Sequence, residues 1–253
     1  MIVAHRGASF DAPENTLAAF REAWKQGADA IEADFYLTQD GRIVCFHDKT
    51  TSRTTGGAAN LTVSSATWEQ LRALDVGAWK NKRFAGERIP TIEEVLAVVP
   101  RDGIIFVELK SGPEIVAPLQ KSLENSQLRP EQVVIICFNE EVIKACRKRM
   151  PQFKANWLTS YKQNKQTGQW SPSQAEVLET LQGSGATGFG TAAKDEVVTA
   201  ELTKAVRDAG IEPHVWTVND PEQARHYAAL GFQSITTDKP AVIRQAVLDG
   251  TTE

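Results

Sequence analysis

Ile104-Ile105-Phe106-Val107-Glu108-Leu109-Lys110 is the stretch of this chain that says most about its fold. Its apolar beginning is typical of a strand that is covered on both faces, as the strands of parallel sheets are. Glu108 and Lys110 stand two positions apart at its end, so both side chains point to the same side of the strand. The stretch therefore predicts a parallel α/β sheet with charged groups at the carboxyl end of a strand.

Seven further strand-like runs alternate with helical patterns along the 253 residues. Eight parallel strands that alternate with helices predict a TIM (β/α)8 barrel, in a single domain covering 1–253. The alternative is an open doubly wound sheet, but no glycine-rich nucleotide fingerprint favours it. The predicted strands are 2–5, 30–36, 104–109, 132–138, 154–159, 186–190, 213–218 and 233–236. The predicted helices are 14–26, 91–99, 114–125, 139–149, 173–183, 199–209, 220–230 and 239–248.

A ninth β-like run, 43–47, follows the turn signal Asp40-Gly41. We interpret it as a short return strand after the second barrel strand, because a TIM barrel has eight strands and the other runs already supply eight. It would carry His47 back to the barrel mouth near Glu32. Residues 49–90 then show weak periodicity and predict a small insertion between the second strand and its helix, at the catalytic face.

The composition limits the classes of function. Lys and Arg total 28 against 32 Asp and Glu, and this formal net charge of −4 disfavours sequence-independent binding of nucleic acid. We find neither a bilayer-spanning run nor a signal-peptide pattern. Three cysteines without metal-type spacing suit a reducing compartment. We therefore expect a cytoplasmic protein that binds no nucleic acid and does not insert stably into membranes.

Acidic residues close two of the predicted strands. Glu32 and Asp34 stand two positions apart, so both would face the barrel interior. Buried carboxylates repel one another unless a cation lies between them, and Glu108 would complete a site of three carboxylates. Oxygen-rich sites of this kind suit Mg²⁺ or Ca²⁺. The alternatives are a surface strand with solvated acids at 30–36 and a structural ion pair of Glu108 with Lys110.

Two of the four histidines, His5 and His47, follow strand-like runs, beside Arg6 and Asp48. A pair of imidazoles can divide the work of proton transfer, one removing a proton and the other donating one. Together with nearby carboxylates they favour metal-assisted phosphoryl chemistry. Because neutral histidine also binds Zn²⁺, a zinc hydrolase acting on another ester is an alternative.

Cationic and aromatic side chains complete the expected site. The guanidinium of Arg6 can hold a phosphate through two parallel hydrogen bonds. Lys110 would supply positive charge for a phosphate oxygen or a departing oxyanion. Trp216 would form an apolar wall for the carbon skeleton of a ligand, with Phe189 as a second candidate. Glu14 fits two roles equally, a helix-start residue or a partner of the metal or of Arg6.

Six motifs carry a resemblance to a known family. They are His5-Arg6-Gly7, Glu14-Asn15-Thr16, Glu32-Ala33-Asp34, Phe46-His47-Asp48, Val107-Glu108-Leu109-Lys110 and Trp216-Thr217-Val218-Asn219. In order and spacing, the chain from Ile2 to about Ala246 resembles the glycerophosphodiester phosphodiesterases. The resemblance implies a TIM barrel, one divalent cation (Mg²⁺ or Ca²⁺), and hydrolysis of small-molecule glycerophosphodiesters such as glycerophosphocholine or glycerophosphoethanolamine to sn-glycerol 3-phosphate and an alcohol.

The resemblance also implies a role for each matching residue. The implied metal ligands are Glu32, Asp34 and Glu108, the implied acid–base pair is His5 and His47, and the implied substrate contacts are Arg6, Lys110 and Trp216. A similarity in kind to phospholipase C and D-type phosphodiesterases gives one alternative. A non-catalytic barrel that binds a phosphate ligand is another, but it would lack a proton-transfer residue or a cation ligand, and none is missing. Water-soluble, deacylated substrates are favoured because we identify no groove for acyl chains.

Overall fold

A closed ring of eight parallel strands forms the centre of the computed structural model, which describes residues 1–250. β1 closes the ring because it pairs with β11 on one side and with β2 on the other. The closure confirms the TIM barrel and excludes the doubly wound sheet, which would keep two unpaired edges. Around the ring the strands are β1 (Ile2–Ala4), β2 (Ala30–Leu37), β4 (Ile104–Leu109), β5 (Val133–Cys137), β6 (Lys154–Thr159), β9 (Gly188–Ala192), β10 (Glu212–Trp216) and β11 (Ser234–Thr237).

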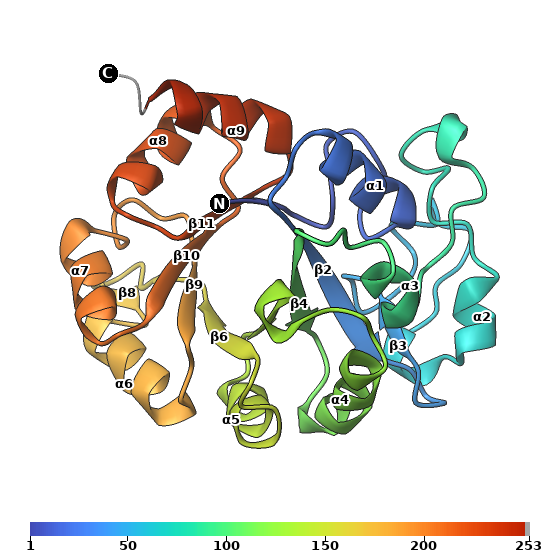
Figure 1. Ribbon diagram of the computed structural model, residues 1–253, viewed down its shortest axis with the longest axis horizontal. Coiled ribbons are helices and arrows are strands. Elements are labelled where there is room, and N and C mark those ends of the chain that lie inside the picture. The colour runs from blue at the N-terminus through green and yellow to red at the C-terminus, as the bar shows by residue number, and fades with distance from the viewer. Residues whose placement is uncertain (251–253) are drawn as a thin grey trace.

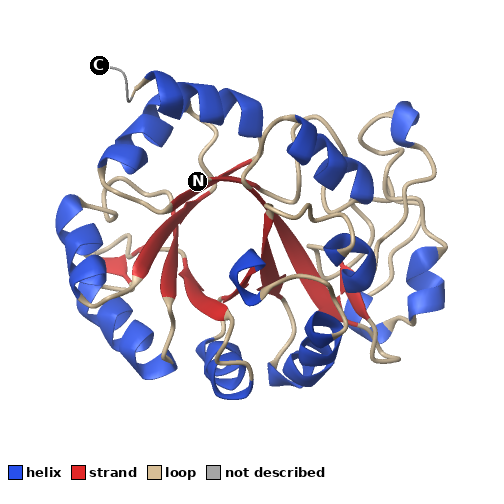
Figure 2. Ribbon diagram, in the orientation of Figure 1, coloured by secondary structure: helices blue, strands red, loops and turns tan. Residues whose placement is uncertain are grey.

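Helices surround the strands on the outside of the ring (Figures 1 and 2). Their first residues follow from local chemistry. The hydroxyl of Thr91 accepts from the backbone N–H of Glu94, whose carboxylate accepts in return from the N–H of Thr91. The outer helices are α1 (Leu17–Lys25), α3 (Ile92–Leu96), α4 (Val116–Glu124), α5 (Glu140–Arg149), α6 (Gln174–Ser184), α7 (Ala200–Asp208), α8 (Pro221–Ala229) and α9 (Pro240–Asp249).

Two predicted helices are too long. The helix predicted at 14–26 begins only at Leu17, because Thr16 is its N-cap and accepts a hydrogen bond from the N–H of Ala19. The helix predicted at 91–99 ends at Leu96, and a turn leads from there to Pro100. The first difference matters for the site, since it leaves the residues before Thr16 in a loop at the barrel mouth.

The barrel interior is built in layers. Side chains two positions apart on a strand point the same way, so Phe106 lies one layer below Glu108 in β4 and His214 one layer below Trp216 in β10. The rings of Phe106 and His214 meet edge to face, with centroids 5.7 Å apart. An apolar cluster fills the interior, and its buried members are Val3, Ala30, Phe106, Val134, Ile136 and Leu158. The buried polar side chains of Asn156, His214 and Ser234 share this region, and the carboxylates of Asp34 and Glu108 lie above it, nearer the carboxyl ends of the strands.

The return strand is confirmed. β3 (Ile43–Cys45) runs antiparallel to β2 outside the ring, with Cys45 opposite Phe35. After it, residues 49–90 pack partly around a small core of their own, and Figure 1 shows them to one side of the barrel, beyond β3. They contain the short helix α2 (Trp68–Arg72) and two 3-10 turns at Val63–Ser65 and Lys82–Phe84. We did not predict α2, whose five residues are too few to show a helical period.

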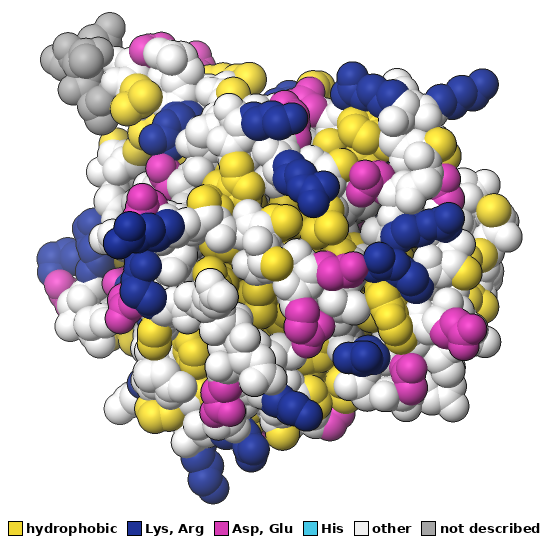
Figure 3. Space-filling model, turned by 45° about the vertical axis from the view of Figure 1, so that its right-hand side comes forward, with side chains coloured by type: hydrophobic (Ala, Val, Ile, Leu, Met, Phe, Trp, Pro, Cys, Tyr) yellow, Lys and Arg dark blue, Asp and Glu magenta, His cyan; other side chains and the backbone are white. Residues whose placement is uncertain are grey.

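A further element missing from the prediction is the two-stranded hairpin of β7 (Lys162–Gln163) and β8 (Trp170–Ser171), in the loop after β6. Short 3-10 turns at Pro113–Ile115 and Pro130–Gln132 complete the elements. None of the helices within residues 1–250 combines the length and the apolar character needed to cross a membrane. On the face drawn in Figure 3, basic and acidic side chains are interspersed, with hydrophobic side chains between them.

Candidate active site

Three buried carboxylates meet at the mouth of the barrel. Asp34 lies opposite Glu108 in the pairing of β2 with β4, and Glu32 precedes Asp34 by one layer. One oxygen from each of the three lies within 4.8 Å of the others. Sequence spacing therefore predicted correctly that these acids converge, and the solvated strand is wrong. Glu108 does pair with Lys110, but it shares this lysine with Asp34.

The electrostatics of this carboxylate cluster fit a bound cation. Burial, reinforced by the charge of Asp34, raises the pKa of Glu32 well above its usual value, and burial raises the pKa of Glu108 to about 7. Burial would also raise the pKa of Asp34, but Lys110 and Arg6 hold it below its usual value. Oε1 of Glu32 is buried and has no hydrogen-bond partner among the described residues. A hard divalent cation would satisfy that oxygen and balance the excess negative charge.

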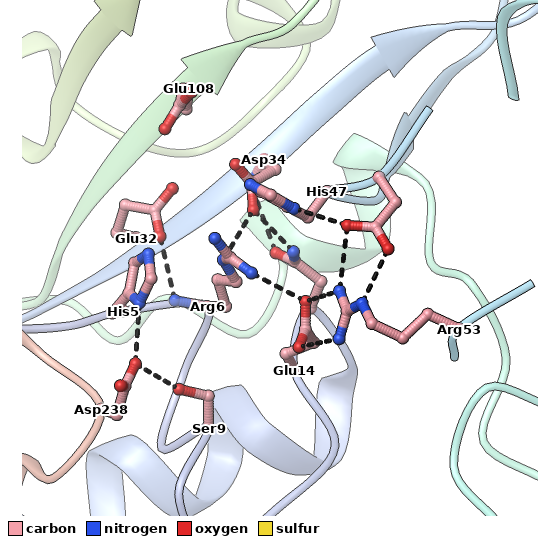
Figure 4. A network of polar contacts seen from close by, with 12 residues as sticks. His5, Arg6, Ser9, Glu14, Glu32, Asp34, His47, Arg53, Glu108 and Asp238 are labelled. Atoms are coloured by element: carbon pink, nitrogen blue, oxygen red, sulfur yellow. Dashed lines mark hydrogen bonds and ion pairs between the residues drawn. The ribbon is translucent and has the colours of Figure 1, made fainter. Parts of the chain in front are cut away.

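His5 follows β1 and is held by an acid from the other end of the chain. Its Nδ1 lies 2.7 Å from Oδ1 of Asp238, which also accepts a hydrogen bond from the hydroxyl of Ser9 (Figure 4). Oδ2 of Asp238 accepts from the side-chain amide of Asn219. An imidazole fixed in this way through Nδ1 can exchange a proton only through Nε2.

His47 is held in a similar way by its own neighbour. Its Nδ1 lies 2.8 Å from Oδ1 of Asp48, and the guanidinium of Arg53 binds the same carboxylate. The bonds from Arg53 lower the pKa of Asp48 to about 2, and burial lowers the pKa of His47 itself. Each histidine therefore has a carboxylate on Nδ1, although one partner is adjacent in sequence and the other is 233 residues away.

Arg6 joins the carboxylate cluster to the loop before α1. Its backbone N–H donates to Oε2 of Glu32 at 2.9 Å, while NH1 of its guanidinium donates to Glu14 at 2.9 Å. Its Nε lies 3.3 Å from Asp34. Arg6 adopts a φ of 56°, an unfavourable conformation for a residue with a side chain, and such strain is typical of functional sites. Gly7 follows at a φ of 81°, and an added Cβ there would clash with Ala19 of α1.

Glu14 and Lys110 take different places around the cluster. Glu14 pairs with the guanidiniums of Arg6 and Arg53. It is not among the three clustered acids. Of the roles expected for Glu14, the geometry therefore supports that of a partner of Arg6. Lys110 binds Asp34 at 2.9 Å and also contacts Glu108. Its two anionic neighbours raise the pKa of Lys110 although burial alone would lower it, so its ammonium stays charged.

A cavity of about 150 Å³ joins these groups to an apolar wall. Trp216 meets Phe138 edge to face there, with ring centroids 5.5 Å apart. The indole Nε1 of Trp216 is buried and has no hydrogen-bond partner within residues 1–250. Phe189 does not line the cavity, and that second candidate is wrong: its ring stacks on Trp157 in the core behind the barrel wall. The cavity is lined by His5, Arg6, Glu32, His47, Glu108, Lys110, Ile136, Phe138, Leu158, Trp216, Thr217 and Thr236.

The family follows from comparison with known proteins. The sequence model of the glycerophosphoryl diester phosphodiesterase family matches residues 5–242. The chain belongs to this family. A glycerophosphodiester phosphodiesterase of Caldanaerobacter subterraneus subsp. tengcongensis is 32% identical, over 99% of this chain and 98% of that protein. A glycerophosphodiester phosphodiesterase of Bacillus subtilis is 30% identical, over 95% of this chain and 84% of that protein.

Solved structures of the glycerophosphoryl diester phosphodiesterase family agree with the barrel. A phosphodiesterase of Oleispira antarctica, solved in complex with the product sn-glycerol-3-phosphate, superposes with a TM-score of 0.85 at 26% identity. The superposition covers 98% of this chain and 96% of that one. The resemblance drawn from the six motifs is therefore confirmed at the level of family and fold.

Several residues around the site were not predicted for it, among them Ile136, Phe138, Leu158 and Thr236 of the cavity lining. Asp238 directly follows β11, so the strand-end position that drew attention to Glu108 could have indicated it. Asn15 belongs to a motif already noted, but only the structure shows its amide donating to Asp34. Ser9 and Arg53 carry no local signal, because both lie in loops without periodicity.

Proposed function

We propose that this family member hydrolyses glycerophosphodiesters to sn-glycerol 3-phosphate and an alcohol with one bound divalent cation, Mg²⁺ or Ca²⁺. As a member of the family the chain is a glycerophosphodiester phosphodiesterase, and the proposal concerns its ion, its substrates and its residues. One observation carries it. Three buried acids converge, with an oxygen of Glu32 left unpaired, between two histidines that are each fixed by a carboxylate.

Glu32, Asp34 and Glu108 are the residues that would hold the cation. When bound, the ion would supply Lewis-acid stabilisation of charge on the phosphoryl oxygens. The cluster contains no histidine or cysteine within the described residues, so its donors are hard oxygens that suit Mg²⁺ or Ca²⁺ better than zinc. This donor set disfavours the zinc hydrolase that the histidines alone left open.

Arg6 and Lys110 would bind the phosphate. Both line the cavity and both keep their charge beside carboxylates. An arginine fork and a lysine ammonium on one phosphodiester neutralise its charge and orient the phosphorus for in-line attack. Trp216 would pack on the carbon skeleton of the glycerol unit, and its unpaired Nε1 could donate to a hydroxyl oxygen.

His5 and His47 would move the protons. A neutral imidazole that donates from Nδ1 to a carboxylate presents a basic Nε2, and a protonated one presents an Nε2–H donor. One histidine would remove the proton from the nucleophile, either a water or the free substrate hydroxyl beside the phosphate, and the other would protonate the leaving oxygen. Asp238 and Asp48 would stabilise the protonated forms and fix the rings in place.

Small, deacylated substrates suit the cavity. A volume of about 150 Å³ is below the roughly 300–1,000 Å³ of pockets that enclose drug-sized ligands. The charged half would take the phosphate, and the wall of Ile136, Phe138, Leu158 and Trp216 would take the three-carbon unit. This division favours glycerophosphocholine or glycerophosphoethanolamine over phospholipids with long acyl chains.

The test is release of sn-glycerol 3-phosphate from glycerophosphocholine by protein treated with EDTA and then given Mg²⁺, Ca²⁺ or Zn²⁺. We expect activity with Mg²⁺ or Ca²⁺ and none after EDTA alone. Release of choline phosphate instead would indicate cleavage on the other side of the phosphorus and contradict the assigned product. Full activity in EDTA would contradict the cation, and rescue by Zn²⁺ alone would favour the zinc alternative.

A further inference from the structure

We propose that Arg53, from the insertion, is a positioning residue that holds one proton-transfer group and one phosphate-binding group in place at the same time. The inference rests on the proposed function, because it assigns Arg53 to the support of His47 and Arg6. Arg53 does not line the cavity, so it is placed to act on the substrate only through those two residues.

The guanidinium of Arg53 binds two carboxylates at once. Nε and NH2 donate to the two oxygens of Asp48 at 2.7 and 3.1 Å, while NH1 and NH2 donate to the two oxygens of Glu14 at 2.8 Å each. Only a planar fork with donors on several edges makes two such pairings from one side chain. Figure 4 shows Arg53 beside Glu14, on the side away from Glu32 and Glu108.

Each of these carboxylates has a second partner nearer the cavity. Oδ1 of Asp48 lies 2.8 Å from Nδ1 of His47, and Oε1 of Glu14 accepts from NH1 of Arg6 at 2.9 Å. Two chains of contacts therefore lead outward from the cavity, one from His47 and one from Arg6, and they end on the same guanidinium. Without it, the two anions would lose their shared counter-charge, and the contacts of Asp48 with His47 and of Glu14 with Arg6 would hold the two inner residues less firmly.

Arg72 offers a matched control within the same insertion. The side chains of Arg53 and Arg72 are each 43% exposed, and each binds carboxylate oxygens. Each guanidinium also lies over a tryptophan ring, that of Arg53 at 5.6 Å from Trp79 and that of Arg72 at 5.2 Å from Trp68. The carboxylate partner of Arg72 is Glu94 at the start of α3, which does not line the cavity.

The experiment compares Arg53→Gln with Arg72→Gln by steady-state kinetics on glycerophosphocholine at saturating Mg²⁺ or Ca²⁺, together with the thermal midpoint of each variant. Misplacement of a reacting group by about 1 Å can lower the rate about a hundredfold. We expect Arg53→Gln to lower kcat/KM by about 10- to 100-fold, with kcat reduced and KM raised. Arg72→Gln should stay within about twofold of the wild type.

Double variants separate positioning from a general structural effect. Arg53→Gln should lose most of its effect on kcat in a His47→Ala background and most of its effect on KM in a Glu14→Gln background, because groups that act as a unit are not additive. Full, additive effects in both backgrounds would overturn the proposal, as would an Arg53→Gln enzyme that matches Arg72→Gln.

Arg53→Lys keeps the test decisive if Arg53→Gln fails to fold. One ammonium cannot reproduce both two-bond pairings, so we expect an intermediate loss. Wild-type kinetics for the lysine variant would show that the fork is not needed and would overturn the inference alone. A wild-type protein that releases no sn-glycerol 3-phosphate would instead overturn the proposed function itself.

Discussion

The mouth of the barrel and the layer below it use the same strands for opposite purposes. At the mouth, His5 and His47 each have a carboxylate on Nδ1 and line a cavity. One layer down, His214 meets the hydroxyl of Ser234 and the ring of Phe106, and its Nε2 has no hydrogen-bond partner among the described residues. Burial lowers the pKa of His214 to about 3, so it stays neutral.

The difference shows which part of the fold contains features that lower the free energy of unfolding. The mouth gathers buried acids, an unpaired oxygen on Glu32 and a left-handed φ at Arg6, all of which lower stability. The layer below is mainly apolar, although it also holds neutral His214 and the buried polar side chains of Asn156 and Ser234. Changes at the mouth should therefore affect activity more than stability, and changes below it should do the reverse.

Removal of the cation, or of one of its ligands, should have the largest effect on activity. Lewis-acid stabilisation contributes several kcal/mol, so EDTA or Glu32→Gln should lower turnover about a thousandfold or more. Because Glu32 is buried with an unpaired oxygen, the glutamine variant should unfold at the same or a higher temperature than the metal-free wild type. A clear fall in its thermal midpoint, with activity retained, would mean that Glu32 serves stability and not activity, which contradicts the expectation for the mouth. Added Mg²⁺ should stabilise only the wild type.

Loss of either histidine at the mouth should have the next largest effect. General acid–base catalysis contributes about 10²–10⁴-fold, so His5→Ala and His47→Ala should each lower kcat by about that amount. Both side chains are partly exposed, at 19% and 32%, so the thermal midpoints should change little. The measurement is kcat on glycerophosphocholine beside thermal unfolding. Wild-type turnover in both variants would end the two-histidine mechanism.

Much of the mouth could be read from the sequence because its main groups follow periodic strands. The i, i+2 spacing of Glu32 and Asp34, and of Glu108 and Lys110, predicts a shared face, and the parallel register then brings the two strand ends together. The same reasoning placed the return strand, since Asp40-Gly41 marks the turn before Ile43–Cys45.

The supporting contacts could not be predicted in the same way. Asp238 reaches His5 because β11 lies beside β1 in the closed ring. The predicted barrel places these two strand ends together, but the bond from this acid to Nδ1 of His5 is seen only in the structure. Arg53 lies in a stretch without periodicity. Its spacing from the other motifs does not distinguish it from the other arginines of the sequence. Helix α2 and the β7–β8 hairpin are too short for a period to emerge.

A milder change tests whether activity depends on Asp238, the acid that contacts His5 from the other end of the chain. Asp238→Asn keeps the size of the side chain but removes the charge that holds His5, so we expect kcat to fall about 10- to 100-fold, less than in His5→Ala. Asp195→Asn is the matched control, since Asp195 also accepts side-chain bonds, from Tyr227 and Gln223, but neither of these partners lines the cavity as His5 does. Equal activity of the two variants would leave Asp238 without a role in positioning His5.

The smallest effect should come from below the mouth and appear only in stability. The pKa of His214 is about 3 in the folded protein and about 6.5 when unfolded, so below pH 6.5 the unfolded chain takes up a proton that the folded chain does not. The contribution of neutral His214 is thus complete above pH 6.5 and is lost as the pH falls toward 3, by up to about 1.4 kcal/mol per pH unit.

His214→Gln isolates this contribution, because the variant keeps every other titrating group. Urea unfolding in EDTA at pH 7.5 and pH 5.0 should show the wild type losing about 2 kcal/mol more than the variant between the two conditions. The kcat of the variant at pH 7.5 should stay within about twofold of the wild type, since His214 does not line the cavity. Parallel losses of stability would mean that His214 is protonated in the folded barrel. The conclusion that buried His214 stays neutral in the lower layer would then be wrong.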